Sequence, residues 1–333
     1  MTLLYDISQQ LLAIFESDDS SVKYYTIVVT FLFLIIIKKL TSSTTKKVAK
    51  LKTLILPNDK EVFSFQEGET KFLYDEIWKD NTYVSHGLEL KENDTVFDIG
   101  SNIGMFSMYC GSITNNNINL FSFEPIPRIH EICKANIDKH VNDNGGNANC
   151  LQLGISDKIS KTTFDFHHNF SLWSTALPDF NERRKDRLFD DLRAMTQSYK
   201  KTGRCKCFFS LVPNFIVSCL AKLFLSLLNR SEKVECNLTT ISTIIKKYNV
   251  QVIDLLKIDI EGCEELALNG IEKSDWKKIR QITLEVENFA AVKRITKKLI
   301  ALGYIVSSQA SERIANPDVS SQVSHLWAYR GRE

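Results

Sequence analysis

The segment FDIGSNIGMF, residues 97–106, combines an aspartate, two glycines and an asparagine at fixed spacing. The four residues of this D-x-G-x-N-x-G pattern are Asp98, Gly100, Asn102 and Gly104. Glycine is needed where the backbone takes a positive φ or approaches a ligand closely, and a helix that begins there offers free N–H groups and a positive dipole end. The pattern predicts a nucleotide-binding turn between a strand and a helix.

Two acidic residues favour one class of cofactor for this turn. Glu124 ends the next apolar run, where a carboxylate suits the ribose hydroxyls of either NAD or S-adenosylmethionine. Asp98 suits a ligand with positive charge and no phosphate near the turn, which describes the ammonium and sulfonium of S-adenosylmethionine. Asn102 stands where a dinucleotide fingerprint has its middle glycine. We therefore expect a methyltransferase, with an NAD-dependent oxidoreductase as the weaker alternative.

Polar residues in later strands are candidates for the reacting end. Methyl transfer to a hydroxyl requires the acceptor oxygen in line with the methyl group and a base that takes the proton. Asp259 and Glu261 alternate with Lys257, so all three share one face of a strand. Asp259 and Glu261 are our first candidates for a base or a substrate clamp, although acids at strand ends are often only solvated or paired with a lysine. His325, in the terminal strand, is a further candidate base.

A divalent metal is a less favoured alternative. Asp259, together with Glu287 and Asn288 after the following strand, supplies oxygen ligands of the kind that Mg²⁺ or Ca²⁺ accepts.

The elements that must position these residues alternate between apolar strands and helices. We expect strands at 62–65, 95–100, 118–125, 149–157, 252–262 and 282–288, and helices at 70–79, 105–113, 128–141 and 264–268. This alternation predicts a doubly wound α/β fold, with a mainly parallel sheet covered by helices on both faces. The strands at 303–308 and 322–330 have no helix between them, which predicts an antiparallel C-terminal edge.

Three stretches together resemble one protein family. VFDIGSNIGMFS, FSFEPIPRIHEICKANI and IDLLKIDIEGCEELALNGI are similar to the FkbM-type family of S-adenosylmethionine-dependent methyltransferases, in order from about residue 75 to 290. The resemblance implies a class I methyltransferase (Rossmann-like) fold, commonly used for O-methylation of small molecules or sugars.

The resemblance also implies roles for individual residues. The pattern that begins at Asp98 would shape the methionine and ribose side of the cofactor site, and Glu124 would hold the ribose. Ser156 and Asp157 match the place that contacts the adenine. A catalytically inactive cofactor-binding membrane protein is a further alternative, against which the intact motif argues.

Residues 22–40 predict one transmembrane helix. The run YYTIVVTFLFLIII, residues 24–37, is uncharged, and the whole span covers about 28 Å at 1.5 Å per residue. A cleaved signal peptide is less favoured because acidic residues precede the run, and a buried core helix is less favoured because the run has no polar face. Lysines concentrate after the span, so the catalytic domain should face the cytosol.

The remaining boundaries follow from these signals. We expect an N-terminal tail at 1–21, a linker at 41–60 and a methyltransferase domain at 61–333. A basic and apolar insertion at about 178–232 would either lie on an anionic membrane surface or pack as a helical lid. The anchor suggests a membrane-associated acceptor, such as a lipid-linked hydroxyl compound. The formal net charge of +2 gives no reason to expect a nucleic-acid partner.

Overall fold

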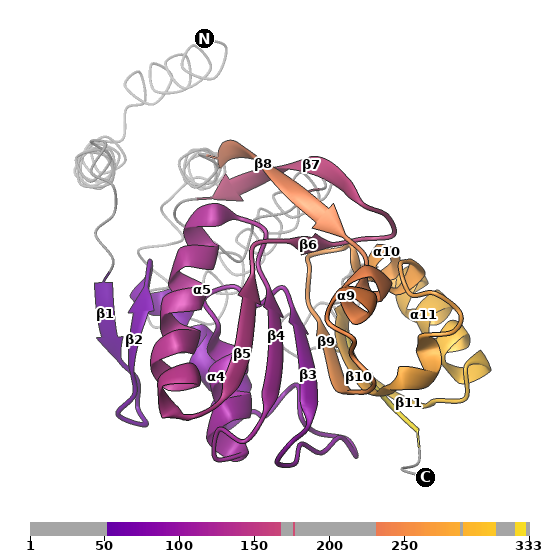
Figure 1. Cartoon of the computed structure of the whole chain (residues 1–333), viewed down its shortest axis with the longest axis horizontal. Coiled ribbons are helices and arrows are strands. Elements are labelled where there is room, and N and C mark those ends of the chain that lie inside the picture. Colours follow the sequence, from indigo (N-terminus) through magenta and orange to yellow (C-terminus); the bar gives the residue numbers. More distant parts are fainter. Residues whose placement is uncertain (1–51, 168–175, 177–230, 287–288, 311–323, 331–333) are drawn as a thin grey trace, which may run out of the picture. The chain divides into compact units, whose positions relative to one another are not determined.

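The computed structural model describes residues 52–167, 176, 231–286, 289–310 and 324–330 (Figure 1). They belong to one compact unit, which comprises Leu51–Asn181 and Ser231–Glu333. The expected tail and membrane span lie outside the described residues, as does nearly all of the insertion at 178–232. Among the residues that the structure describes, no helix is both long and apolar enough to cross a membrane.

A seven-stranded sheet forms the centre of this unit, with the strand order β11-β12-β10-β9-β3-β4-β5. Its strands are β3 (Thr95–Ile99), β4 (Asn119–Phe123), β5 (Asn147–Leu151), β9 (Ile253–Ile258), β10 (Ile279–Val286), β11 (Ile305–Ala310) and β12 (Ser324–Tyr329). Strands β10, β9, β3, β4 and β5 are parallel, whereas β12 is antiparallel to both β10 and β11. The predicted α/β fold and its antiparallel edge are confirmed.

Helices cover both faces of this sheet (Figure 1). On one face lie α4 (Met105–Ile113) and α5 (Pro127–His140), whose buried residues share a core with Val96 and Leu120. On the other face lie α9 (Ile241–Lys247), α10 (Glu264–Asn269) and α11 (Phe289–Ala301), which pack on Phe97 and Leu256. Because side chains alternate along each strand, neighbouring residues enter different cores. The near-continuous apolar strands are those of a sheet buried on both sides.

A second sheet of three strands, in the order β6-β8-β7, begins directly after β5. Its strands are β6 (Gly154–Ile155), β7 (Ser160–His167) and β8 (Ser231–Thr239). The single strand expected at 149–157 is therefore wrong, because the chain turns after Leu151 and Gly154 pairs with Leu238 of β8. A Cβ atom at Gly154 would lie 2.5 Å from the Leu238 side chain, so this close pairing depends on a glycine.

The N-terminal end of the unit is a hairpin of β1 (Lys52–Ile55) and β2 (Glu61–Ser64), followed by α3 (Glu67–Tyr74) and a π-helical turn η1 (Asp75–Lys79). Strand β1 lies within the segment expected as a linker at 41–60, so the folded unit begins earlier than predicted. Strand β1 pairs with β2, and β2 is held by the buried side chain of Asn136 on α5, which accepts from the Phe63 N–H at 2.8 Å and donates to the Phe63 carbonyl oxygen at 3.0 Å. The hairpin is an integral part of the domain.

Candidate active site

A cavity of about 620 Å³ lies at the carboxyl ends of β3, β4 and β9. Its lining includes seven residues that the sequence nominated, namely Gly100, Asn102, Glu124, Ser156, Asp157, Asp259 and Glu261. The small sheet closes part of it, through Phe164 of β7 and Leu238 of β8. Ligands of open α/β sheets bind outside the carboxyl ends of the strands, and this volume suits a small organic ligand.

The turn after β3 takes a left-handed path that its glycines permit. Gly100 has a φ of 77°, and a Cβ atom there would lie 1.8 Å from the carbonyl oxygen of Asp259. Gly104 has a φ of 84° at the N-terminus of α4, where a Cβ atom would lie 3.2 Å from the carbonyl oxygen of Cys133. Gly100 thus lets β3 and β9 end side by side, and Gly104 lets α4 approach α5. Gly104 does not line the cavity.

Asp98 is fully buried and does not line the cavity. Its Oδ1 atom lies 3.3 Å from Nζ of Lys257, and Ser107 donates a hydrogen bond of 2.7 Å to its Oδ2 atom. The Lys257 ammonium also donates to the carbonyl oxygen of Gly100 at 2.9 Å. The positive charge beside Asp98 therefore comes from Lys257 of the protein and not from a ligand. The ion pair stabilises the turn, because the same ammonium also binds the Gly100 carbonyl oxygen.

Burial acts against the charge of Lys257, but the carboxylates of Asp98 and Asp259 outweigh burial and raise the pKa of Lys257 above its ordinary value. Lys257 Nζ lies 3.5 Å from Asp259 Oδ2. The lysine is consequently a permanent cation that couples β3 to the end of β9. Its role was visible in the sequence only as a possible partner of the strand acids.

Glu124 occupies the end of β4, where only 5% of its surface is exposed. Burial raises its pKa to about 8, although the Ile126 N–H, which donates to Oε1 at 2.9 Å, favours the carboxylate. The backbone of Asn102 also interacts favourably with this carboxyl group. Glu124 is thus fixed against the turn and presents a hydrogen-bonding carboxyl group to the cavity.

Ser156 and Asp157 follow β6 and lie at the cavity beyond Glu124. The Ser156 N–H donates to the carbonyl oxygen of Thr239 at 2.8 Å, which holds this loop against β8. The Ser156 hydroxyl donates to Oδ1 of Asp157 at 3.2 Å. Both positions therefore depend on the small sheet, which sequence reasoning did not predict.

Asp259 lies at the opposite side of the cavity, directly after β9. The hydroxyl of Tyr83 donates to its Oδ2 atom at 2.9 Å. Burial, together with the charges of Asp259, Glu76 and Glu285, raises the pKa of Tyr83, so this phenol stays a hydrogen-bond donor. Glu261 also lines the cavity and has a φ of 55° in the tight turn before Gly262. Tyr83 was missed because it lies in a loop without a recognisable motif.

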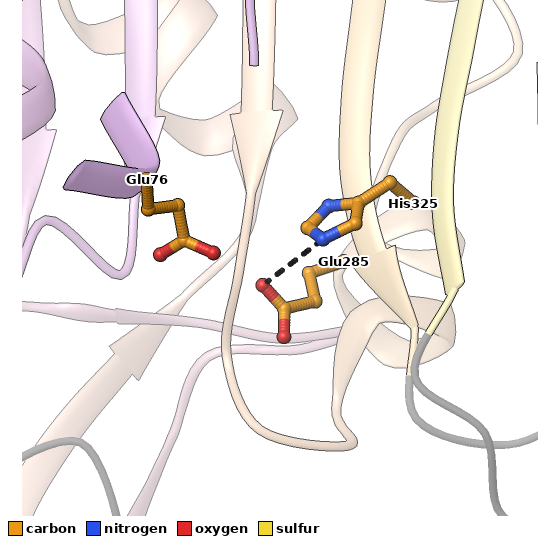
Figure 2. Close-up of side chains that lie close together, drawn as sticks. All are labelled: Glu76, Glu285 and His325. Atoms are coloured by element: carbon orange, nitrogen blue, oxygen red, sulfur yellow. Dashed lines mark ion pairs between the residues drawn. The ribbon is translucent and has the colours of Figure 1, made fainter. Parts of the chain in front are cut away.

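His325 does not line the cavity but lies behind Tyr83, with the two ring centroids 6.1 Å apart. Its Nε2 atom lies 4.0 Å from Oε2 of Glu285, its partner in the antiparallel pairing of β10 and β12 (Figure 2). Glu76 of η1 points toward the same place, and donor atoms of the three side chains lie within 4.8 Å of one another. Glu287 and Asn288, of the alternative metal set with Asp259, lie outside the described residues.

Comparison with known proteins identifies the family. The sequence model of the Methyltransferase FkbM domain matches residues 98–306, which is more than half of the chain. The chain belongs to the FkbM methyltransferase family. It is therefore a methyltransferase, and the oxidoreductase alternative is set aside. The matched range includes the turn after β3, Glu124 and the acidic residues after β9.

The chain is similar to several individual proteins. The chain is 28% identical over 270 residues to the 31-O-demethyl-FK506 methyltransferase FkbM of Streptomyces tacrolimicus, a match that covers 81% of this chain and 95% of that one. It is 24% identical over 231 residues to the methyltransferase sdnD of Sordaria araneosa, covering 67% and 77% of the two chains. The solved structure of methyltransferase FkbM from Methylobacillus flagellatus superposes with a TM-score of 0.42 at 13% identity, over 73% of this chain and 45% of that chain.

Proposed function

We propose that this FkbM-family protein transfers a methyl group from S-adenosylmethionine to a hydroxyl oxygen of a small-molecule, sugar or lipid-linked acceptor. The observation that carries the proposal is the cavity that joins the D-x-G-x-N-x-G turn, Glu124 and Asp259 at one edge of the sheet. S-adenosylmethionine supplies an electrophilic methyl group on a sulfonium centre. Residues of the chain bind this donor, orient the acceptor and take the proton of the acceptor hydroxyl.

The residues on the β3, β4 and β5 side of the cavity fit the donor. Glu124 is an acceptor for two ribose hydroxyls, and the backbone of the turn at Gly100 and Asn102 is available to the amino-acid end. Ser156 and Asp157 offer a hydroxyl and a carboxylate where an adenine amine needs an acceptor. The cation at the turn, Lys257, is already paired with Asp98 and Asp259, and Glu124 adds a carboxyl group, which suits a cationic donor better than a dinucleotide.

The residues on the β9 side fit the acceptor. The Asp259 carboxylate is held by Tyr83 and Lys257, so its position at the cavity is fixed before a substrate binds. We assign to Asp259 the acceptance of the hydroxyl proton and to Glu261 the orientation of the acceptor. His325, behind Tyr83, has no direct access to the cavity lining.

An oxygen acceptor is supported by the family. The relative from Streptomyces tacrolimicus is named for methylation of 31-O-demethyl-FK506, a small molecule that lacks an O-methyl group. A lipid-linked acceptor is supported by the uncharged run at 24–37, which we propose anchors the enzyme with its catalytic domain in the cytosol.

Ligand binding separates this proposal from its rivals. S-adenosylhomocysteine should raise the melting temperature of the full-length protein, whereas NAD should leave it unchanged. Glu124→Gln should weaken the shift, and the matched change Glu131→Gln, at an exposed position of α5, should keep it. A shift with NAD alone would contradict the proposal.

Label transfer then defines the acceptor. S-adenosylmethionine with a labelled methyl group is incubated with separated lipid, sugar and protein fractions. The label should appear as a methyl ether in a lipid or sugar fraction and should be lost in Asp259→Asn. Cofactor binding without transfer to any fraction would favour the catalytically inactive alternative. Flotation of the full chain with liposomes, compared with a chain that starts at Leu51, tests the anchor.

A further inference from the structure

Glu76, Glu285 and His325 converge on one point although they are far apart in the sequence. They come from η1, β10 and β12, and their donor atoms lie within 4.8 Å of one another (Figure 2). Glu76 and His325 are buried, with 7% and 9% of their surfaces exposed, and Glu285 is partly buried. Two carboxylates and an imidazole at this spacing form a set of ligands for a divalent cation.

Four carboxylates lie in this part of the domain. Lys257 contributes one positive charge, which Asp98 and Asp259 already share at 3.3 and 3.5 Å. Glu76 and Glu285 bring two further carboxylates into a part of the domain where water is largely excluded. Like charges at this separation are costly unless a cation lies between them. A divalent cation between these carboxylates would lower this cost, as would a proton on the His325 imidazole, which lies 4.0 Å from Glu285.

The backbone fixes these three donors before a ligand arrives. Glu285 and His325 are paired in the register of β10 and β12, so their side chains leave the same face of the sheet. The indole of Trp327 on β12 donates to the carbonyl oxygen of Thr82 at 2.8 Å, which ties the loop after η1 to the same strand. A metal site requires ligands held in place in this way.

We propose that Glu76, Glu285 and His325 bind one divalent transition metal ion, such as Mn²⁺ or Zn²⁺. The imidazole favours such ions over Mg²⁺ and Ca²⁺, which prefer oxygen ligands. With three protein ligands, the remaining coordination positions are open to water. Tyr83 and Ile77 line the cavity, and they are neighbours of His325 and Glu76 respectively, so the ion lies behind the acceptor side of the cavity.

The role of the ion rests on the proposed methyl transfer, but its binding does not. None of the three ligands lines the cavity, so the ion acts indirectly on the deprotonation of the acceptor hydroxyl, through Tyr83, whose own hydroxyl donates to Asp259 at 2.9 Å. The proton of the acceptor hydroxyl passes to the Asp259 carboxylate, and the oxygen then takes the methyl group as the sulfur–carbon bond breaks.

Metal binding is measured on the full-length protein after treatment with a chelator. Titration with Mn²⁺, followed by the loss of the paramagnetic signal of free Mn²⁺, should show one saturable site from which Zn²⁺ displaces the ion. Glu285→Gln and His325→Gln should each weaken Mn²⁺ binding by at least about tenfold. His140→Gln is the matched control, because this imidazole contacts the backbone of Glu61 on the far side of α5.

A second measurement shows that a loss of binding is not a loss of folding. Without metal, Glu285→Gln should melt at the same temperature as the unchanged protein or higher, since it removes one of two neighbouring negative charges. Added Mn²⁺ should raise the melting temperature of the unchanged protein and of His140→Gln only.

The outcomes separate the two proposals. Binding of S-adenosylhomocysteine without saturable Mn²⁺ or Zn²⁺ binding overturns the metal site and leaves the methyl transfer intact. Metal binding without binding of S-adenosylhomocysteine overturns the proposed methyl transfer and leaves the metal site intact. Unchanged Mn²⁺ affinity in both Glu285→Gln and His325→Gln, or an imidazolium at His325 that persists above pH 8 in NMR titration, also overturns the site, because a charged histidine would itself balance the glutamates.

Discussion

The ammonium of Lys257 lies 3.3 Å from the carboxylate of Asp98, and both side chains are buried in the middle of the sheet. Lys257→Met would leave Asp98 as an isolated buried charge, so we expect a loss of about 3–5 kcal/mol in the free energy of unfolding. Urea unfolding measures this loss.

The matched control is Lys161→Met, whose lysine pairs with Glu235 at 2.8 Å while both side chains are largely exposed. This change should cost less than about 1 kcal/mol. Asp98→Asn in the Lys257→Met background should recover part of the lost stability. Equal effects of the two lysine substitutions would contradict the buried pair. Asp98→Ala should likewise lower the free energy of unfolding. Substitution of a residue that only bound the cofactor would lower cofactor affinity and leave the folding stability unchanged.

Gly100 should tolerate no side chain. Gly100→Ala places a Cβ atom 1.8 Å from the Asp259 carbonyl oxygen, at a φ of 77°. The ends of β3 and β9 must then separate, so the melting temperature should fall and the shift with S-adenosylhomocysteine should disappear.

Gly68 supplies a matched control within α3. Nothing lies within 4 Å of a Cβ atom built there, so Gly68→Ala should be neutral or slightly stabilising. If Gly100→Ala retains full cofactor binding, the close contact between the two strand ends is not required.

Cofactor affinity should depend on pH through Glu124. Its pKa is raised from 4.5 to about 8 by burial, so the folded protein holds this proton at pH values at which the unfolded chain has lost it. Stability without ligand should therefore fall as the pH rises from 4.5 to about 8. Ribose hydroxyls bind the carboxylate, so the affinity for S-adenosylhomocysteine should increase about tenfold or more between pH 6 and pH 8.

Calorimetric titration across this pH range tests the prediction, with proton release upon binding below pH 8 as a second signal. Glu124→Gln should bind more weakly and show a flat profile, and Glu131→Gln should keep the original profile. A flat profile in the unchanged protein would show that Glu124 does not lose a proton when the ligand binds.

Asn136 should be essential to the attachment of the N-terminal hairpin. Its side-chain amide accepts a hydrogen bond from the Phe63 N–H and donates one to the Phe63 carbonyl oxygen. It also donates to the carbonyl oxygen of Ile103 at 2.8 Å, next to the cofactor turn. Asn136→Ala leaves these backbone groups buried without partners, so it should cost about 1–3 kcal/mol. Hydrogen exchange should show early opening of β2. Asn144→Ala, at an exposed site, should change neither quantity.

The parts of the fold that the sequence predicted are those with a local signal. The strands around Asp98 and Glu124 and the turn with its glycines can each be predicted from the types of a few neighbouring residues. The division of 149–157 into β5 and β6 has no such signal, because it depends on pairing between Gly154 and the distant Leu238. Strand β1 was assigned to a linker for the same reason, since it forms only by pairing with β2.

The candidate site divides in the same way. Residues that follow a predicted strand, such as Glu124 and Asp259, could be nominated from alternation alone. Glu76 and Tyr83 could not, because they reach the site through packing of η1 and its following loop against β12. The pairing of Glu285 with His325 required the register of two antiparallel strands, which a single sequence does not give.

The two sides of the cavity have different origins along the chain. The residues assigned to the donor lie between Gly100 and Asp157, whereas those assigned to the acceptor side and to the proposed metal site, Glu76, Tyr83, Asp259, Glu285 and His325, come from separate segments. Substitutions in any one of these segments can therefore change the acceptor without altering the residues assigned to the donor. Chimeras that aim to move acceptor specificity between enzymes must therefore exchange the segment around Glu76 and Tyr83 together with the residues after Lys257.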